Sequence, residues 1–283
     1  MKIWKGIVRL LFALAAALAA SVAMGTWELP GESDLIASWQ GFRLTASGIG
    51  AGLSLLVLLG FAEAWIAGSR KTSPEEDGIG RVWNGIGFGL LPAVLIWKIF
   101  EAQTSRGGGD AAPGEIPGAG WLLREGRWLP AQAEALLAAG LLIAVILWLV
   151  LRKEPIPENG DLMGISLGCY AAGRMLTEGF RAGQESRWFG GLAGWIAAAV
   201  MICALAVWIA RAVRAKENTG YALACAPVML AAVAGTVLIQ NGILRTGNPW
   251  ADLGMEAVCS LLAMKSLCCM GRVTRKGQLR RDM

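Results

Sequence analysis

The chain has 283 residues, of which 55% are hydrophobic and 17% are charged, and its formal net charge is +5 at pH 7. The charged residues gather in the gaps between long apolar blocks, which is typical of a multi-pass membrane protein and argues against a soluble helical bundle. Histidine is absent, so a Ser–His or Cys–His nucleophile and a histidine metal site are excluded.

Eight apolar segments predict membrane-spanning helices. They cover residues 8–27, 44–67, 83–100, 131–151, 162–180, 192–210, 221–244 and 253–270. We therefore expect an all-α, polytopic transmembrane helix bundle of about eight spans. The fifth segment is the least hydrophobic because it carries charged side chains.

Basic residues predict the orientation of these spans. Lys and Arg precede the first segment and follow the second, fourth, sixth and eighth, whereas the opposite loops hold several acids. The positive-inside rule then places both termini in the cytoplasm, and this bias accounts for the net charge without a nucleic-acid partner. The first segment could instead be a cleaved signal peptide, but its apolar run is long, which favours a retained anchor.

Small and polar residues within the spans predict how the helices pack. Glycines recur four residues apart at 48 and 52, 85 and 89, 164 and 168, and 190 and 194, and such pairs let helices approach closely in lipid. Gln240 and Asn241, near the end of the seventh segment, are expected to bond neighbouring helices. The six cysteines form no CxxC pair, so neither a metal site nor a disulfide framework is expected.

Two pairs of polar residues mark the outer ends of the third and fourth segments. Lys98 and Glu101 are three residues apart, and we expect their side chains to extend to the membrane interface. Gln132 and Glu134 open the fourth segment on the same side and could line a shared cavity. For Gln132, a role at the start of the helix is at least as well supported.

The fifth segment carries the strongest candidate site. Tyr170, Arg174, Glu178 and Arg181 follow at spacings of four, four and three, which places them on one face of a helix. Ionisable groups at membrane depth usually face a protein interior or a cavity and mark function. Two guanidinium groups against one carboxylate suit an anionic phospholipid headgroup. The alternative is a self-contained ion-pair network that holds helices together.

The same residues resemble a known family. The segment Tyr-Ala-Ala-Gly-Arg-Met-Leu-Thr-Glu-Gly-Phe-Arg, at 170–181, is similar to the C-terminal motif of prolipoprotein diacylglyceryl transferases. Pro-Ala-Gln at 130–132 resembles part of their His-Pro-Ser-Gln-Leu-Tyr-Glu motif. The resemblance covers about residues 40–214. We therefore divide the chain into an anchor helix with an outer loop (1–39), a transferase-like core (40–214) and two extra spans with a basic tail (215–283).

The resemblance implies an activity and roles for individual residues. Members of the family move diacylglyceryl from phosphatidylglycerol to the lipobox cysteine of a preprolipoprotein, in the bacterial plasma membrane and without a metal or cofactor. By this resemblance Arg174 would contact the lipid phosphate and Glu178 would hold the arginines, as the catalytic pair. Tyr170, Arg181 and Gln132 would bind the substrate.

The chain also departs from the family pattern. It has no counterpart of the central His-Gly-Gly segment or of the Gly-Arg-x-Gly-Asn-Phe motif, and the similar stretch at 80–84 lies at the opposite membrane end, as in a chance match. These departures favour an alternative, a catalytically inactive relative that binds anionic phospholipid or a membrane-protein partner. A small transporter has little support, because apart from Pro92 no broken helix suggests an alternating pathway.

Overall fold

A computed structural model describes residues 2–27, 35–39, 42–72, 78–104, 123–124, 126–151, 160–178, 191–215, 219–241, 243–244 and 246–279. The chain forms two compact units, Met1–Met163 and Gly164–Met283. The described residues form eight helices and four short strands.

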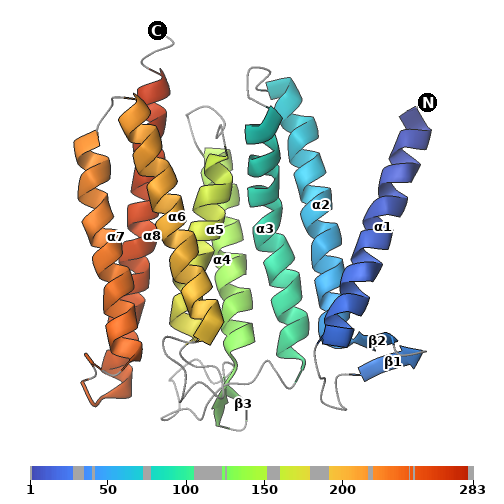
Figure 1. Cartoon of the computed structure of the whole chain (residues 1–283), viewed down its shortest axis with the longest axis horizontal. Helices are drawn as coiled ribbons and strands as arrows, with labels where there is room; N and C mark the ends of the chain where they lie inside the picture. Colours follow the sequence, from blue (N-terminus) through green and yellow to red (C-terminus); the bar gives the residue numbers. More distant parts are fainter. Residues whose placement is uncertain are drawn as a thin grey trace. The chain divides into compact units, whose positions relative to one another are not determined.

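The first unit contains the long helices α1 to α4, with one small antiparallel hairpin between α1 and α2 and another between α3 and α4 (Figure 1). Its elements are α1 (Lys2–Trp27), β1 (Leu35–Trp39), β2 (Phe42–Thr45), α2 (Ala46–Thr72), α3 (Gly78–Ala102), β3 (Leu123–Arg124), β4 (Arg127–Trp128) and α4 (Pro130–Leu151). Within this unit consecutive helices run in opposite directions. The turn from β3 to β4 contains Gly126 at φ +73°, a conformation that glycine adopts without strain.

The second unit consists of helices. They are α5 (Asp161–Glu178), which starts at the end of the first unit, α6 (Gly191–Ala215), α7 (Thr219–Gln240) and α8 (Pro249–Leu279). Their buried apolar side chains form one core, with Met201 and Met229 on α6 and α7 fully buried. Gly164 and Gly168 of α5 lie against Trp208 and Leu267 of this core.

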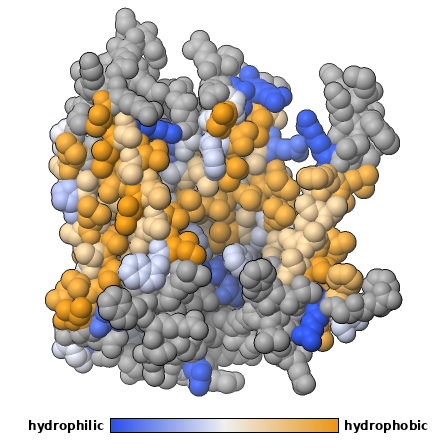
Figure 2. Space-filling model, viewed as in Figure 1, coloured by the Kyte–Doolittle hydropathy of each residue, from blue (hydrophilic) through white to orange (hydrophobic). Residues whose placement is uncertain are grey.

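The structure confirms the predicted all-α architecture, since a helix occupies the position of each predicted span. Within the described residues, α2, α3, α4, α6 and α7 are long and apolar enough to cross a membrane. The apolar part of α1, Arg9–Ala23, is shorter, and α5 and α8 do not reach the same combination of length and hydropathy. Apolar side chains cover much of the visible surface of α1 in the first unit and of α7 in the second (Figure 2).

The contact between α2 and α3 confirms the packing role of the glycine pair at 85 and 89, whereas Gly190 of the last predicted pair lies outside the described residues. A Cβ atom at Gly89 would lie 2.6 Å from the backbone oxygen of Leu58, and one at Gly85 would lie 2.9 Å from that of Ala62. The backbones of α2 and α3 therefore approach at a distance that only glycine allows. Gly48 and Gly52 admit α1 to α2 in the same way, against Ala17 and Ser21.

We expect Gly89→Leu to lower the free energy of unfolding by about 2 kcal/mol or more, because the new side chain must push α2 and α3 apart. The matched control is Gly140→Leu, since Gly140 is exposed on α4 and has open space around its Cβ position. We expect the control to change stability by less than about 0.5 kcal/mol. Unfolding in detergent micelles measures both values, and equal losses would show that the glycine contact does not set the helix spacing.

Candidate functional site

The start of α5 is fixed by a contact from α3. The backbone N–H of Leu162 donates to Oδ1 of the fully buried Asn84 at 2.9 Å, which satisfies one of the donors that a helix N-terminus leaves unpaired. Asp161 supplies a carboxylate in the first turn, where its negative charge interacts favourably with the positive end of the helix dipole. The sequence offers no signal for this capping contact, because 78 positions separate Asn84 from Leu162.

The predicted charged face lies on the second half of α5. Tyr170 is buried and Arg174 is half-buried, one helical turn further on. Glu178 is the last residue of the helix. Its side chain and the whole of Arg181 lie outside the described residues. The structure thus brings Tyr170 and Arg174 onto one helical face, as predicted, and their roles toward a substrate remain predictions.

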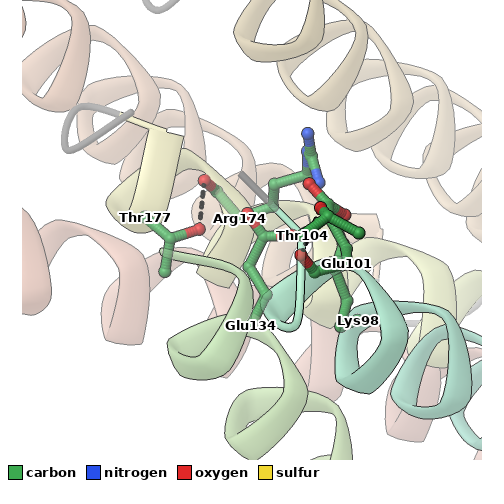
Figure 3. A network of polar contacts seen from close by, with 6 residues as sticks. All are labelled: Lys98, Glu101, Thr104, Glu134, Arg174 and Thr177. Atoms are coloured by element: carbon green, nitrogen blue, oxygen red, sulfur yellow. Dashed lines mark hydrogen bonds and ion pairs between the residues drawn. The ribbon is translucent and has the colours of Figure 1, made fainter. Parts of the chain in front are cut away.

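The C-terminal turns of α5 are held by side chains of the same unit. Gln240 Nε2 of α7 donates to the backbone oxygen of Met175 at 2.7 Å, next to Arg174. Thr177 Oγ1 donates to the backbone oxygen of Arg174 at 3.1 Å, a bond drawn in Figure 3. The prediction that Gln240 bonds a neighbouring helix is confirmed. For Asn241 the described bond is local: its Nδ2 donates at 2.8 Å to the backbone oxygen of Val237 in α7, the helix that it follows.

A buried cluster of charges lies where α3 and α4 meet. Lys98 Nζ is 2.6 Å from Glu101 Oε2 and 2.7 Å from Glu134 Oε2. In Figure 3 the side chains of Lys98 and Glu101 from α3 and of Glu134 from α4 point toward one another. Lys98 is 2% exposed, Glu101 8% and Glu134 0%. Because a charge in a low-dielectric interior is costly, such a cluster persists only where its members pair closely.

This cluster corrects the prediction that Lys98 and Glu101 extend to the membrane interface. Their spacing shows that they share a helix face, but it does not show that α4 places a third charged group beside them. With Glu134 present, the ammonium group is paired on two sides and stays buried. At this end of α3 the backbone oxygen of Glu101 is also hydrogen-bonded, since it accepts from Thr104 Oγ1 at 2.7 Å.

Gln132 lies in the first turn of α4 and is half-buried. It belongs to the first unit, whereas Tyr170 and Arg174 belong to the second. The prediction that Gln132 joins them in one substrate site stays a prediction. Among the described residues, no group of three or more cysteine, aspartate or glutamate side chains is arranged to hold a metal ion.

The fold defines the class of protein first: a multi-pass helical membrane protein with an arginine on a half-buried helix face and a buried ion cluster. Residues 78–213, which span α3, α4, α5 and most of α6, match the family model of prolipoprotein diacylglyceryl transferase. The chain is therefore related to that family, which confirms the resemblance suggested by its sequence. No curated protein and no solved structure matches the chain.

Proposed function

We propose that the protein is a diacylglyceryl transferase that takes its donor lipid from phosphatidylglycerol and its acceptor from the lipobox cysteine of a preprolipoprotein. The observation that carries this proposal is the family match over residues 78–213, which contains Tyr170, Arg174 and Glu178 at the spacing of the family motif. By the same relationship, the protein acts in the bacterial plasma membrane. The division into a core at 40–214 and two added spans is part of this proposal.

The chemistry asks for an anion site beside a reacting carbon. The sulfur of the lipobox cysteine forms a bond to the glycerol carbon of the donor, the bond from that carbon to the phosphate oxygen breaks, and glycerol phosphate leaves with the electron pair. The Arg174 guanidinium is suited to the phosphate, since its planar donors match two phosphate oxygens and stabilise the charge on the leaving group. Tyr170, Arg181 and Gln132 would bind the rest of the substrate.

The thiol proton must pass to a side chain other than histidine, because the chain has none. Glu178 is the first candidate, since it lies one turn from Arg174 on α5. It would hold the arginines in the resting protein and accept the proton when the cysteine attacks as thiolate. This assignment gives Glu178 and Arg174 the two catalytic roles that the family resemblance implies.

The test is a transfer reaction with purified protein in lipid. A peptide with a lipobox cysteine is mixed with phosphatidylglycerol, and we expect the mass of one diacylglyceryl group to be added to the peptide. The same peptide with serine in place of cysteine, and phosphatidylethanolamine in place of phosphatidylglycerol, are the matched substrate controls. A mass shift that persists with both controls would show a different chemistry.

A second function is favoured by one specific observation, the absence of histidine and of the family's central motif. In that case the protein is an inactive relative that binds anionic phospholipid, or a membrane-protein partner. No mass shift, together with retention of phosphatidylglycerol over phosphatidylethanolamine on the purified protein, would support lipid binding without chemistry. If the protein shows neither transfer nor preferential retention, both the transferase function and the binding of anionic phospholipid are excluded.

A further inference from the structure

An exposed salt bridge lies on the surface of the first unit. Arg9 of α1 and Glu63 of α2 pair through Nη1 and Oε1 at 3.3 Å. Their side chains are 73% and 64% exposed, so the pair contrasts with the buried Lys98 cluster of the same unit. An ion pair this open to its surroundings leaves donor and acceptor atoms of both groups accessible to a further partner.

The position of this pair along α2 makes its exposure unusual. Glu63 follows the start of α2 at Ala46 by about 26 Å along the helix axis, at 1.5 Å per residue. The apolar span of α2 runs on to Arg70. Since a hydrocarbon core is about 30 Å thick, Glu63 falls within the part of α2 that is long and apolar enough to cross a membrane, where an exposed charge would meet lipid rather than water. Charged side chains at this depth usually face protein.

Beside Glu63, small residues recur along α2. Gly60, Ala64 and Gly68 are four residues apart and all are exposed. A Cβ atom at Gly60 or at Gly68 would meet nothing within 4 Å. On α3, Gly85 and Gly89 have the same spacing, and the α2 backbone occupies the space beside them. The face of α2 around Gly60 therefore has the form of a helix-packing surface, and within the described part of the chain it is open at Gly60 and Gly68.

We propose that this face, made by Arg9, Glu63 and the small residues Gly60, Ala64 and Gly68, binds a second copy of the same chain. The charges carry the choice of partner. In a two-fold contact the same patch meets itself, so Arg9 of one copy lies beside Glu63 of the other, and the reverse. A patch that holds one positive and one negative charge is complementary to itself. Exposed apolar residues of α1, including Leu10 and Phe12, supply the lipid-excluding border.

The experiment uses two full-length copies with different affinity tags, produced together and extracted in mild detergent. One tag is captured and the amount of the other is measured. We expect the native pair to co-purify. Arg9→Glu in both copies places four acidic groups at the contact, and Glu63→Arg in both copies places four basic groups there, so each should lower co-purification about tenfold or more.

The decisive arm combines Arg9→Glu in one copy with Glu63→Arg in the other. This mixture restores opposite charges only between copies, whereas neither chain regains its own internal pair. We expect co-purification to return to near the native level. A general loss of folding would lower this arm as well, so recovery cannot come from folding. Arg43→Glu, a similar change at an exposed residue of β2, is the control and should leave co-purification unchanged.

Gly60→Leu tests the small residues independently. It should lower co-purification, because a leucine side chain on the packing face keeps the two copies apart. The single chain should stay folded, since the space around the Cβ position of Gly60 is open. The proposal is overturned if native copies do not co-purify. It is also overturned if the mixed pair is as weak as the two matched single variants, since the ion pair then acts only within one chain.

Discussion

Arg174→Ala is expected to lower the rate of diacylglyceryl transfer by about 100- to 1,000-fold, the loss typical of removing one group that stabilises transition-state charge. The guanidinium offers two parallel donors to the phosphate, and alanine offers none. Arg174→Lys should lie between, because lysine keeps the charge and loses the planar fork. Initial rates with phosphatidylglycerol and the lipobox peptide measure all three proteins.

The control for Arg174 is the same change at an arginine away from α5. Arg43 is exposed on β2, and Arg43→Ala should leave the rate within about twofold. The stability of each protein must also be measured by unfolding in micelles, because the alternative is that the α5 charges serve only to hold helices together. If Arg174→Ala unfolds or does not insert, the ion-pair role is correct. If it is folded and fully active, Arg174 is not the phosphate-binding residue.

The positions of the helices could be predicted because the physical signal is long and local. A span needs about 20 apolar residues, and each predicted segment contains such a run or, in the fifth, a run interrupted by charges. The packing role of the glycine pairs could be predicted for a similar reason, since residues four apart lie on one helix face whatever that face packs against. Gly85 and Gly89 indeed meet the α2 backbone. The hairpins could not be predicted, because strands of two to five residues are too short to show a periodic pattern.

The environment of a polar side chain could not be predicted in the same way. Lys98 and Glu101 are close in the sequence, so their pairing was visible, but the contribution of Glu134 depends on how α4 packs against α3. That packing turned two residues expected at the interface into a buried cluster. The link between Arg9 and Glu63 has the same origin, since 54 positions separate them. The candidate face on α5, by contrast, is formed by residues of a single helix, so their spacing in the sequence was enough to predict it.

Lys98→Met is expected to lower the free energy of unfolding by about 3–5 kcal/mol, the cost of breaking a buried ion pair by removing one partner. Lys98 Nζ lies within 2.7 Å of a carboxylate oxygen from each of α3 and α4. Methionine has a similar length, so the change removes the charge and leaves little cavity. The two glutamates then keep their negative charges in a buried place without the ammonium group that they share. Unfolding in micelles measures the loss.

The control is Lys265→Met on α8, where the lysine is exposed and no comparable penalty arises. The combined change Lys98→Met, Glu101→Gln and Glu134→Gln tests the cause. It removes all three charges, so it should recover much of the stability lost in the single variant, because well-packed neutral groups often replace a buried ion cluster at little cost. If the triple variant is less stable than Lys98→Met alone, the penalty does not come from uncompensated charge. The glutamates would then stabilise the α3–α4 contact through bonds that do not depend on Lys98.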